Sequence, residues 1–234
     1  MDIAGKKALV FGGTSGIGLA TSKQLAALGA DVVAISRAPD RAGDVPAGIT
    51  LAACDVLDRD ALAAVFANHA PFDILVSAAT GGTRARGEFL DMDIDGFQGS
   101  FAKLWGYANV LQLGTPHLSA EGTIVLVSGT PARRPNPGQV AISCVGGAVE
   151  ALARAVAREI TPRRLNVVSP GTIDTPASAL TGAERAESYR KQTARNLIPR
   201  AGKADEVAKG IIFVIENDFV TGTTVDVDGG RLLA

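Results

Sequence analysis

Nine residues near the start of the chain, Val10-Phe11-Gly12-Gly13-Thr14-Ser15-Gly16-Ile17-Gly18, connect an apolar stretch at 7–11 to an amphipathic one beginning near 17. The first pattern predicts a buried strand and the second predicts a helix. The three glycines have separate uses in such a joint: Gly12 permits a tight turn, Gly16 lets a diphosphate reach the helix N-terminus, and Gly18 lets the helix pack closely. Most glycine-rich turns bind nothing, but a strand before the turn and a helix after it favour a dinucleotide site.

The composition and charge are those of an ordinary globular protein. Of the 234 residues, 47% are hydrophobic, and 23 Lys+Arg against 24 Asp+Glu give a net charge of −1. There is therefore no electrostatic reason to expect nucleic acid or a membrane as a partner. Cys54 and Cys144 match no metal-ligand spacing, so we expect reduced cysteines and no metal site. Because the sequence has neither a signal-peptide pattern nor an uninterrupted apolar run of membrane length, we expect a cytoplasmic protein.

Strand and helix patterns alternate along the whole chain. This alternation predicts one α/β domain over residues 1–234, a doubly wound parallel sheet of about seven strands with helices on both faces. The polar, irregular stretch 176–202 is expected to be a substrate lid. The predicted strands are 7–11, 31–35, 49–53, 73–76, 122–127, 164–168 and 224–227, and the predicted helices are 17–28, 58–68, 95–118, 140–160 and 205–216.

Four motifs in sequence order resemble those of the short-chain dehydrogenase/reductase family. They are the glycine turn, with Phe11 where threonine is usual, Asp55-Val56 after the third strand, the segment Ser169-Pro170-Gly171-Thr172-Ile173-Asp174-Thr175, and Val227-Asp228-Gly229-Gly230. The resemblance covers essentially the whole chain. It implies a Rossmann-type fold, oxidoreductase activity on a small-molecule substrate, a bound nicotinamide dinucleotide and a homo-oligomer, either a tetramer or a dimer.

The choice of cofactor depends on the end of the second predicted strand. An acidic residue there would bond the adenosine ribose and repel a 2′-phosphate, but this chain has Ser36-Arg37. Since a guanidinium grips phosphate through paired hydrogen bonds, we expect NADP(H) rather than NAD(H). The alternative is that Arg37 points into water. The predicted cofactor-binding residues are Gly12, Thr14, Ser15, Gly16, Ile17, Gly18, Ser36, Arg37, Asp55, Val56, Ser77, Ala78, Ala79, Ile173 and Thr175.

The positions of the family's Asn-Ser-Tyr-Lys tetrad hold other residues. By the family's pattern, Ile142 stands at the tyrosine position, Gly146 at the lysine position, Gly129 at the serine position and Lys103 at the asparagine position. Neither isoleucine nor glycine can transfer a proton. The resemblance thus implies an atypical member in which a positioned acid or base, worth about 10²–10⁴-fold in rate, is missing.

Four side chains, one of them Lys103, are candidates for a replacement role. Lys103 and Tyr107 are four residues apart on a predicted helix and could meet on one face, although a solvated lysine beside a packed tyrosine is the alternative. Ser128 is one residue from the serine position. Ser143 follows Ile142 but is turned by about 100° on a helix.

The sequence leaves three functions open. The first is an NADP(H)-dependent oxidoreductase with a non-standard active site acting on an unknown small molecule. The second is a catalytically inactive nucleotide-binding sensor or a partner subunit of an active relative. The third is a non-redox isomerase, dehydratase or cyclase that uses the same pocket.

Overall fold

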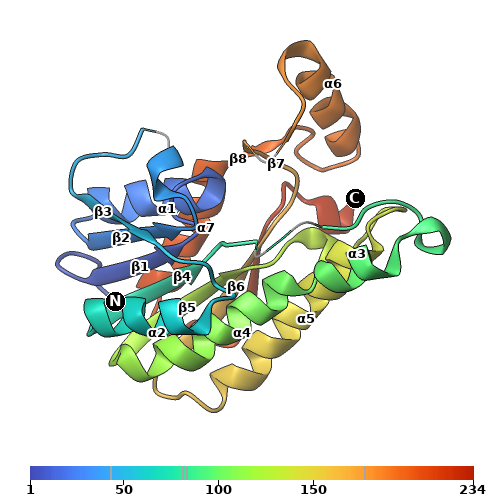
Figure 1. The fold of residues 1–234 in the computed structure, drawn as a ribbon. Coiled ribbons are helices and arrows are strands. Elements are labelled where there is room, and N and C mark those ends of the chain that lie inside the picture. Colours follow the sequence, from blue (N-terminus) through green and yellow to red (C-terminus); the bar gives the residue numbers. More distant parts are fainter. Residues whose placement is uncertain (43, 81, 83, 177) are drawn as a thin grey trace.

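The computed structural model, which describes residues 1–42, 44–80, 82, 84–176 and 178–234, contains a parallel sheet of seven strands (Figure 1). The strands follow the order β3-β2-β1-β4-β5-β6-β9. Successive strands are therefore added in one direction from β1 to β3 and in the opposite direction from β4 to β9. The doubly wound fold predicted from the alternation is confirmed. The strands are β1 (Lys7–Phe11), β2 (Asp31–Ser36), β3 (Ile49–Ala53), β4 (Phe72–Ser77), β5 (Leu118–Val127), β6 (Arg164–Pro170) and β9 (Thr224–Val227), and a separate pair is formed by β7 (Ile173–Asp174) and β8 (Gly202–Lys203).

Helices cover both faces of the sheet. One face carries α1 and α7, which pack against each other, and the other carries α2, α4 and α5 (Figure 1). The helices are α1 (Gly16–Ala27), α2 (Arg59–His69), α3 (Ile94–Gly99), α4 (Ala102–Gly114), α5 (Val140–Ala157), α6 (Gly182–Thr193) and α7 (Ala204–Glu216). Short 3₁₀ turns lie at Pro39–Arg41, Phe89–Asp91, Thr115–His117, Thr130–Ala132 and Arg231–Leu233.

The core has two layers because the central strands are apolar on both faces. On one side Phe66 of α2 packs 5.6 Å from Phe11, measured between ring centroids, with Tyr107 of α4 in the same cluster. On the other side Leu25 of α1 and Ile211 of α7 are fully buried against the sheet. Burial of these side chains holds the ends of the strands, and therefore the site, in fixed positions.

The expectation of one helix over residues 95–118 is wrong. The structure has two helices, α3 and α4, separated at Ser100, whose hydroxyl donates to the Gly96 carbonyl at 2.9 Å and accepts from the Ala85 amide at 2.8 Å. The second helix ends at Gly114, because Pro116 cannot donate a helical hydrogen bond, and β5 already begins at Leu118.

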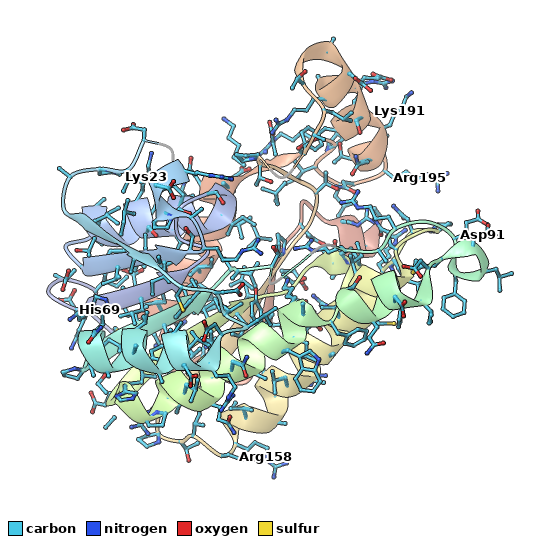
Figure 2. The ribbon with its side chains drawn as sticks, viewed as in Figure 1. Lys23, His69, Asp91, Arg158, Lys191 and Arg195 are labelled. Carbon is cyan, nitrogen blue, oxygen red and sulfur yellow. The ribbon has the colours of Figure 1, made fainter. Side chains whose placement is uncertain are left out.

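The segment 176–202 is also more regular than expected, since it contains α6. This helix has no broad apolar face and is supported by ion pairs on its own surface, in which Glu187 contacts Arg190 at 2.7 Å and Lys191 at 3.6 Å. It projects away from the sheet (Figure 1), with Lys191 near its C-terminal end and Arg195 just beyond that end (Figure 2).

The helix α5 is long and apolar enough, by length and composition alone, to cross a membrane, although Glu150 and Arg154 interrupt its apolar sequence. Its inner face, including Val149 and Ala153, is buried in the core against the sheet. Packing of this kind is typical of a core helix.

Candidate functional site

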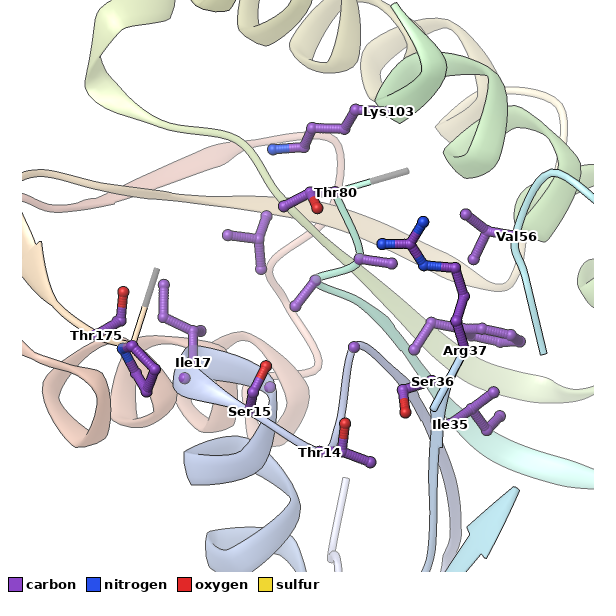
Figure 3. A pocket seen from close by; sticks show the side chains of 18 of the residues that line it. Thr14, Ser15, Ile17, Ile35, Ser36, Arg37, Val56, Thr80, Lys103 and Thr175 are labelled. Atoms are coloured by element: carbon purple, nitrogen blue, oxygen red, sulfur yellow. The ribbon is translucent and has the colours of Figure 1, made fainter. Parts of the chain in front are cut away.

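A cavity of about 530 Å³ lies at the carboxyl ends of β1, β2, β4 and β6 (Figure 3). It spans the place where the strand order reverses, between β1 and β4, which is where ligands bind in open α/β sheets. Of the fifteen residues predicted to bind a cofactor, fourteen line this cavity. The exception is Ser77, which is fully buried behind the wall, with a hydroxyl that has no partner among the described residues.

The glycine turn is as tight as the sequence predicts. Gly12 has a φ of +77°, and a Cβ there would lie 2.9 Å from the carbonyl carbon of Ala78 at the end of β4. A Cβ at Gly18 would collide with the carbonyl oxygen of Gly12. Gly16, with a φ of +51°, faces the open cavity, where the nearest atom to its Cβ position is Thr175 Cβ at 3.5 Å.

The N-terminus of α1 opens into the same cavity. Its N-cap residue, Ser15, is extended and its side chain makes no capping hydrogen bond. At the start of the helix, the Leu19 amide donates to the Ser15 carbonyl at 3.0 Å. The amides of the first turn therefore remain available to an anion, and the helix dipole favours negative charge at this end.

At the end of β2, the side chains of Ser36 and Arg37 border the cavity. The Ser36 hydroxyl is buried and has no partner among the described residues. Arg37 is exposed, and its guanidinium extends over the cavity (Figure 3). A buried hydroxyl without a partner beside a free guanidinium is a suitable environment for a phosphate group.

The opposite rim is formed by the segment around β7, which includes Ile173 and Thr175. β7 is held by its pairing with β8, and the Gly202 amide donates to the Thr172 carbonyl at 2.9 Å. Arg185 of α6 forms an ion pair with Asp174 and donates to the Thr175 carbonyl at 2.8 Å. The predicted lid segment is thus tied directly to the cavity rim.

A smaller cavity of about 60 Å³ adjoins the inner end of the first. It brings together all four residues at the family's tetrad positions, Lys103, Gly129, Ile142 and Gly146. Of these only Lys103 carries a titratable side chain. A Cβ at Gly146 would lie 2.9 Å from Ala132 Cβ, so the wall is closed against a larger residue there.

Lys103 and Tyr107 do meet on one face of α4, with the ammonium 5.3 Å from the ring centroid. The tyrosine hydroxyl, however, donates to the Val127 carbonyl at 3.0 Å, and Tyr107 lines neither cavity. Burial raises the pKa of this phenol well above its usual value. Tyr107 is therefore a packed core residue and not a proton donor to the cavity.

The Lys103 side chain is buried and reaches into the cavity (Figure 3). Burial, with a smaller effect of the Arg84 charge, lowers its pKa to about 7.

The two candidate serines differ in their positions. Ser128 lines both cavities, and its buried hydroxyl lies 3.2 Å from the Gly146 carbonyl and 3.3 Å from Glu150 Oε1. Ser143 lies outside the lining of either cavity, as its position one residue after Ile142 on a helix predicts.

The sequence reasoning missed two charged residues near the inner cavity, Arg84, which lines it, and Glu150, which contacts the lining residue Ser128. Arg84 lines both cavities from a loop after β4, and no motif marks it. Glu150 is buried on α5 and its carboxylate lies 3.5 Å from Arg133 Nε. The described residues contain no group of three or more metal-ligating side chains, and in the same ranges both cysteines are free.

Comparison with known proteins gives consistent similarities. The sequence pattern of the family described as enoyl-(acyl carrier protein) reductase matches residues 12–231. The chain is 31% identical to the 3-oxoacyl-[acyl-carrier-protein] reductase FabG of Thermotoga maritima, covering 100% of both. A short chain dehydrogenase from Burkholderia cenocepacia in complex with NADP is 31% identical, with a TM-score of 0.87 and 100% of both chains covered. A small-chain dehydrogenase in complex with NADPH is 27% identical, with a TM-score of 0.84, covering 98% of this chain and 100% of that one.

Proposed function

The chain belongs to the short-chain dehydrogenase/reductase family of oxidoreductases, and from that premise we propose that it uses NADP(H) in an active site without the family's usual proton donor. The observation that carries the cofactor choice is the pair at the end of β2, the partnerless Ser36 hydroxyl and the Arg37 guanidinium beside the cavity. Two similar structures contain NADPH or NADP, which supports this choice.

The cavity lining is more basic than acidic, and the groups suited to the cofactor phosphates lie at the end formed by α1 and β2. Three lining residues, Arg37, Arg84 and Lys103, are basic and one, Asp55, is acidic. In the proposed complex the first-turn amides of α1 hold the diphosphate and Arg37 holds the 2′-phosphate. When bound, the nicotinamide supplies or accepts a hydride.

The residues around the inner cavity limit the reaction. Ile142 and Gly146 offer no proton, and the Tyr107 hydroxyl is engaged with Val127. We therefore propose substrates whose reduction does not require a tyrosine acid, such as an activated carbon–carbon double bond or an iminium. The protein's part is to orient the substrate and exclude water, with the segment 176–202 acting as a lid.

The cofactor assignment is tested by fluorescence titration with NADPH and NADH. Arg37→Asp should weaken NADPH binding roughly 10- to 100-fold, because a charge-assisted pair is replaced by repulsion, and should change NADH binding much less. Arg41→Asp is the control, since Arg41 lies four residues on but outside the cavity lining. An equal loss for both cofactors would show that Arg37 does not contact the 2′-phosphate.

A nucleotide sensor or inactive partner subunit is the second candidate, favoured by the same absence of a proton donor at residues 142 and 146. A stopped-flow screen for NADPH oxidation against carbonyl, alkene and imine compounds separates the two. Turnover on any panel member supports the oxidoreductase, and tight binding without turnover supports the sensor. A non-redox isomerase, dehydratase or cyclase would convert its substrate with no change in NADPH absorbance.

We further propose a cytoplasmic homo-oligomer, a dimer or tetramer, whose partner is a small-molecule substrate and neither nucleic acid nor a membrane. Exposed apolar side chains on neighbouring helices, Ile94 of α3 and Trp105 of α4, support self-association. The net charge of −1 supports the absence of polyanionic partners.

A further inference from the structure

Two basic side chains lie at the inner end of the cavity. Arg84 and Lys103 both line the main cavity and the small cavity beside it. Burial, and to a smaller extent the Arg84 charge, lowers the pKa of Lys103, and desolvation lowers the pKa of Arg84. No carboxylate contributes to either shift, and neither side chain has an ion pair with another described residue.

The backbone holds this pair in place. Ala85, the residue after Arg84, donates its amide to the Ser100 hydroxyl at 2.8 Å, and Ser100 lies at the junction of α3 and α4. Lys103 is the second residue of α4, in its first turn just beyond that junction. The loop that carries Arg84 is therefore fixed to the helix that carries Lys103, and the two cations are positioned by one hydrogen-bonded unit.

Each neighbouring acid is occupied elsewhere. Glu150, which enters from α5, is 3.5 Å from Arg133 and within hydrogen-bond distance of Ser128. Asp55, which lines the main cavity, accepts a hydrogen bond from the Leu57 amide at 3.0 Å. Lys103 is buried whereas Arg84 is exposed, and a buried cation without a counterion is costly, so an anionic ligand between the two would relieve the cost at Lys103.

We propose that Arg84 and Lys103 form an anion-binding subsite that holds the carboxylate of a small substrate. The side cavity of about 60 Å³ has room for a few non-hydrogen atoms, since roughly 10–15 Å³ of such space holds one water. Its other walls include the apolar side chains of Ile142, Val145 and Pro131. They would exclude water from the ion pair between the bound carboxylate and the two cations. The assignment of this anion as substrate rests on the proposed function, whereas the subsite itself does not.

We expect the subsite to depend on pH, because burial shifts the pKa of Lys103 toward neutrality. Three groups surround the Lys103 amine: Arg84 on the loop after β4, Tyr107 on the same helix as Lys103, and Ser128 at the end of β5. Because the amine loses its proton with a pKa of about 7, carboxylate affinity should fall as the pH rises through and above 7. A carboxylate probe stays ionised over this range, so the change belongs to the protein.

The experiment is calorimetric titration of the protein with acetate and with the neutral acetamide, with and without saturating NADPH. Acetate should bind measurably more tightly than acetamide, and more tightly at pH 6 than at pH 8.5. Lys103→Met and Arg84→Met should each weaken acetate binding roughly 10- to 100-fold. Arg86→Met is the matched control, because it removes a nearby charge that lines neither cavity.

Each outcome bears on the proposal. Equal affinity for acetate and acetamide, or acetate binding that survives both substitutions, would overturn it. Displacement of acetate by NADPH would also overturn it, because the cations would then belong to the cofactor site. If the protein fails to bind NADPH, the proposed function fails, while the titration without cofactor still tests the subsite. Circular dichroism and Lys103→Arg, which keeps the charge, separate loss of binding from loss of fold.

Discussion

At the scale of single residues, Lys103 carries a charge whose burial should reduce the stability of the protein. Its pKa is about 7 in the folded chain against about 10.4 when unfolded, so between these values the unfolded state binds more protons. Stability should therefore rise with pH in this window, and the penalty is complete below pH 7. Lys103→Met should raise the melting temperature at pH 6, by roughly 2–4 °C for each kcal/mol of desolvation removed, and by less at pH 9. Thermal unfolding at the two pH values measures this, with Lys209→Met as an exposed control that should change little. A variant less stable than the parent at pH 6 would contradict this account.

At the scale of elements, the attachment of α6 to the cavity rim depends on Arg185. This side chain joins α6 to Asp174 and to the Thr175 carbonyl, whereas Arg190 on the same helix pairs with Glu187, which also lies within it. Arg185→Ala should speed amide hydrogen exchange across residues 182–193 several-fold without changing the melting temperature, because the helix contributes little to the core. Arg190→Ala should leave the exchange of Thr175 and its neighbours unchanged. Equal effects of both substitutions at the rim would show that Arg185 does not anchor the helix.

The same elements show what sequence patterns can and cannot predict. The apolar runs 31–35 and 164–168 predict buried strands because local composition alone determines their burial, and the glycine turn predicts its own shape for the same reason. The break at Ser100 depends on a hydroxyl that bonds the Ala85 amide from another segment, and α6 depends on ion pairs rather than an apolar face. Arg84 reaches the site through a loop with no motif. These features arise from tertiary contacts that a single sequence does not display.

At the scale of the whole molecule, ligand binding at the N-terminus of α1 should stabilise the entire fold. The reason is that the cavity is lined by strands from both halves of the sheet, on either side of the reversal between β1 and β4. At 100 times its dissociation constant, a ligand that binds only the folded state adds about 2.7 kcal/mol, or roughly 5–10 °C in melting temperature. NADPH should produce such a shift, and Gly16→Asp should abolish it, since the new carboxylate would occupy the first-turn amides and repel the diphosphate.

Gly29→Asp is the matched control: Gly29 also has a positive φ, +86°, and 3.5 Å of clearance at its Cβ, but lies at the other end of α1. Both variants carry a similar backbone strain, so a shift that persists in the Gly29 variant and vanishes in the Gly16 variant would locate the diphosphate at this helix. Retention of the full shift by the Gly16 variant would place the ligand elsewhere.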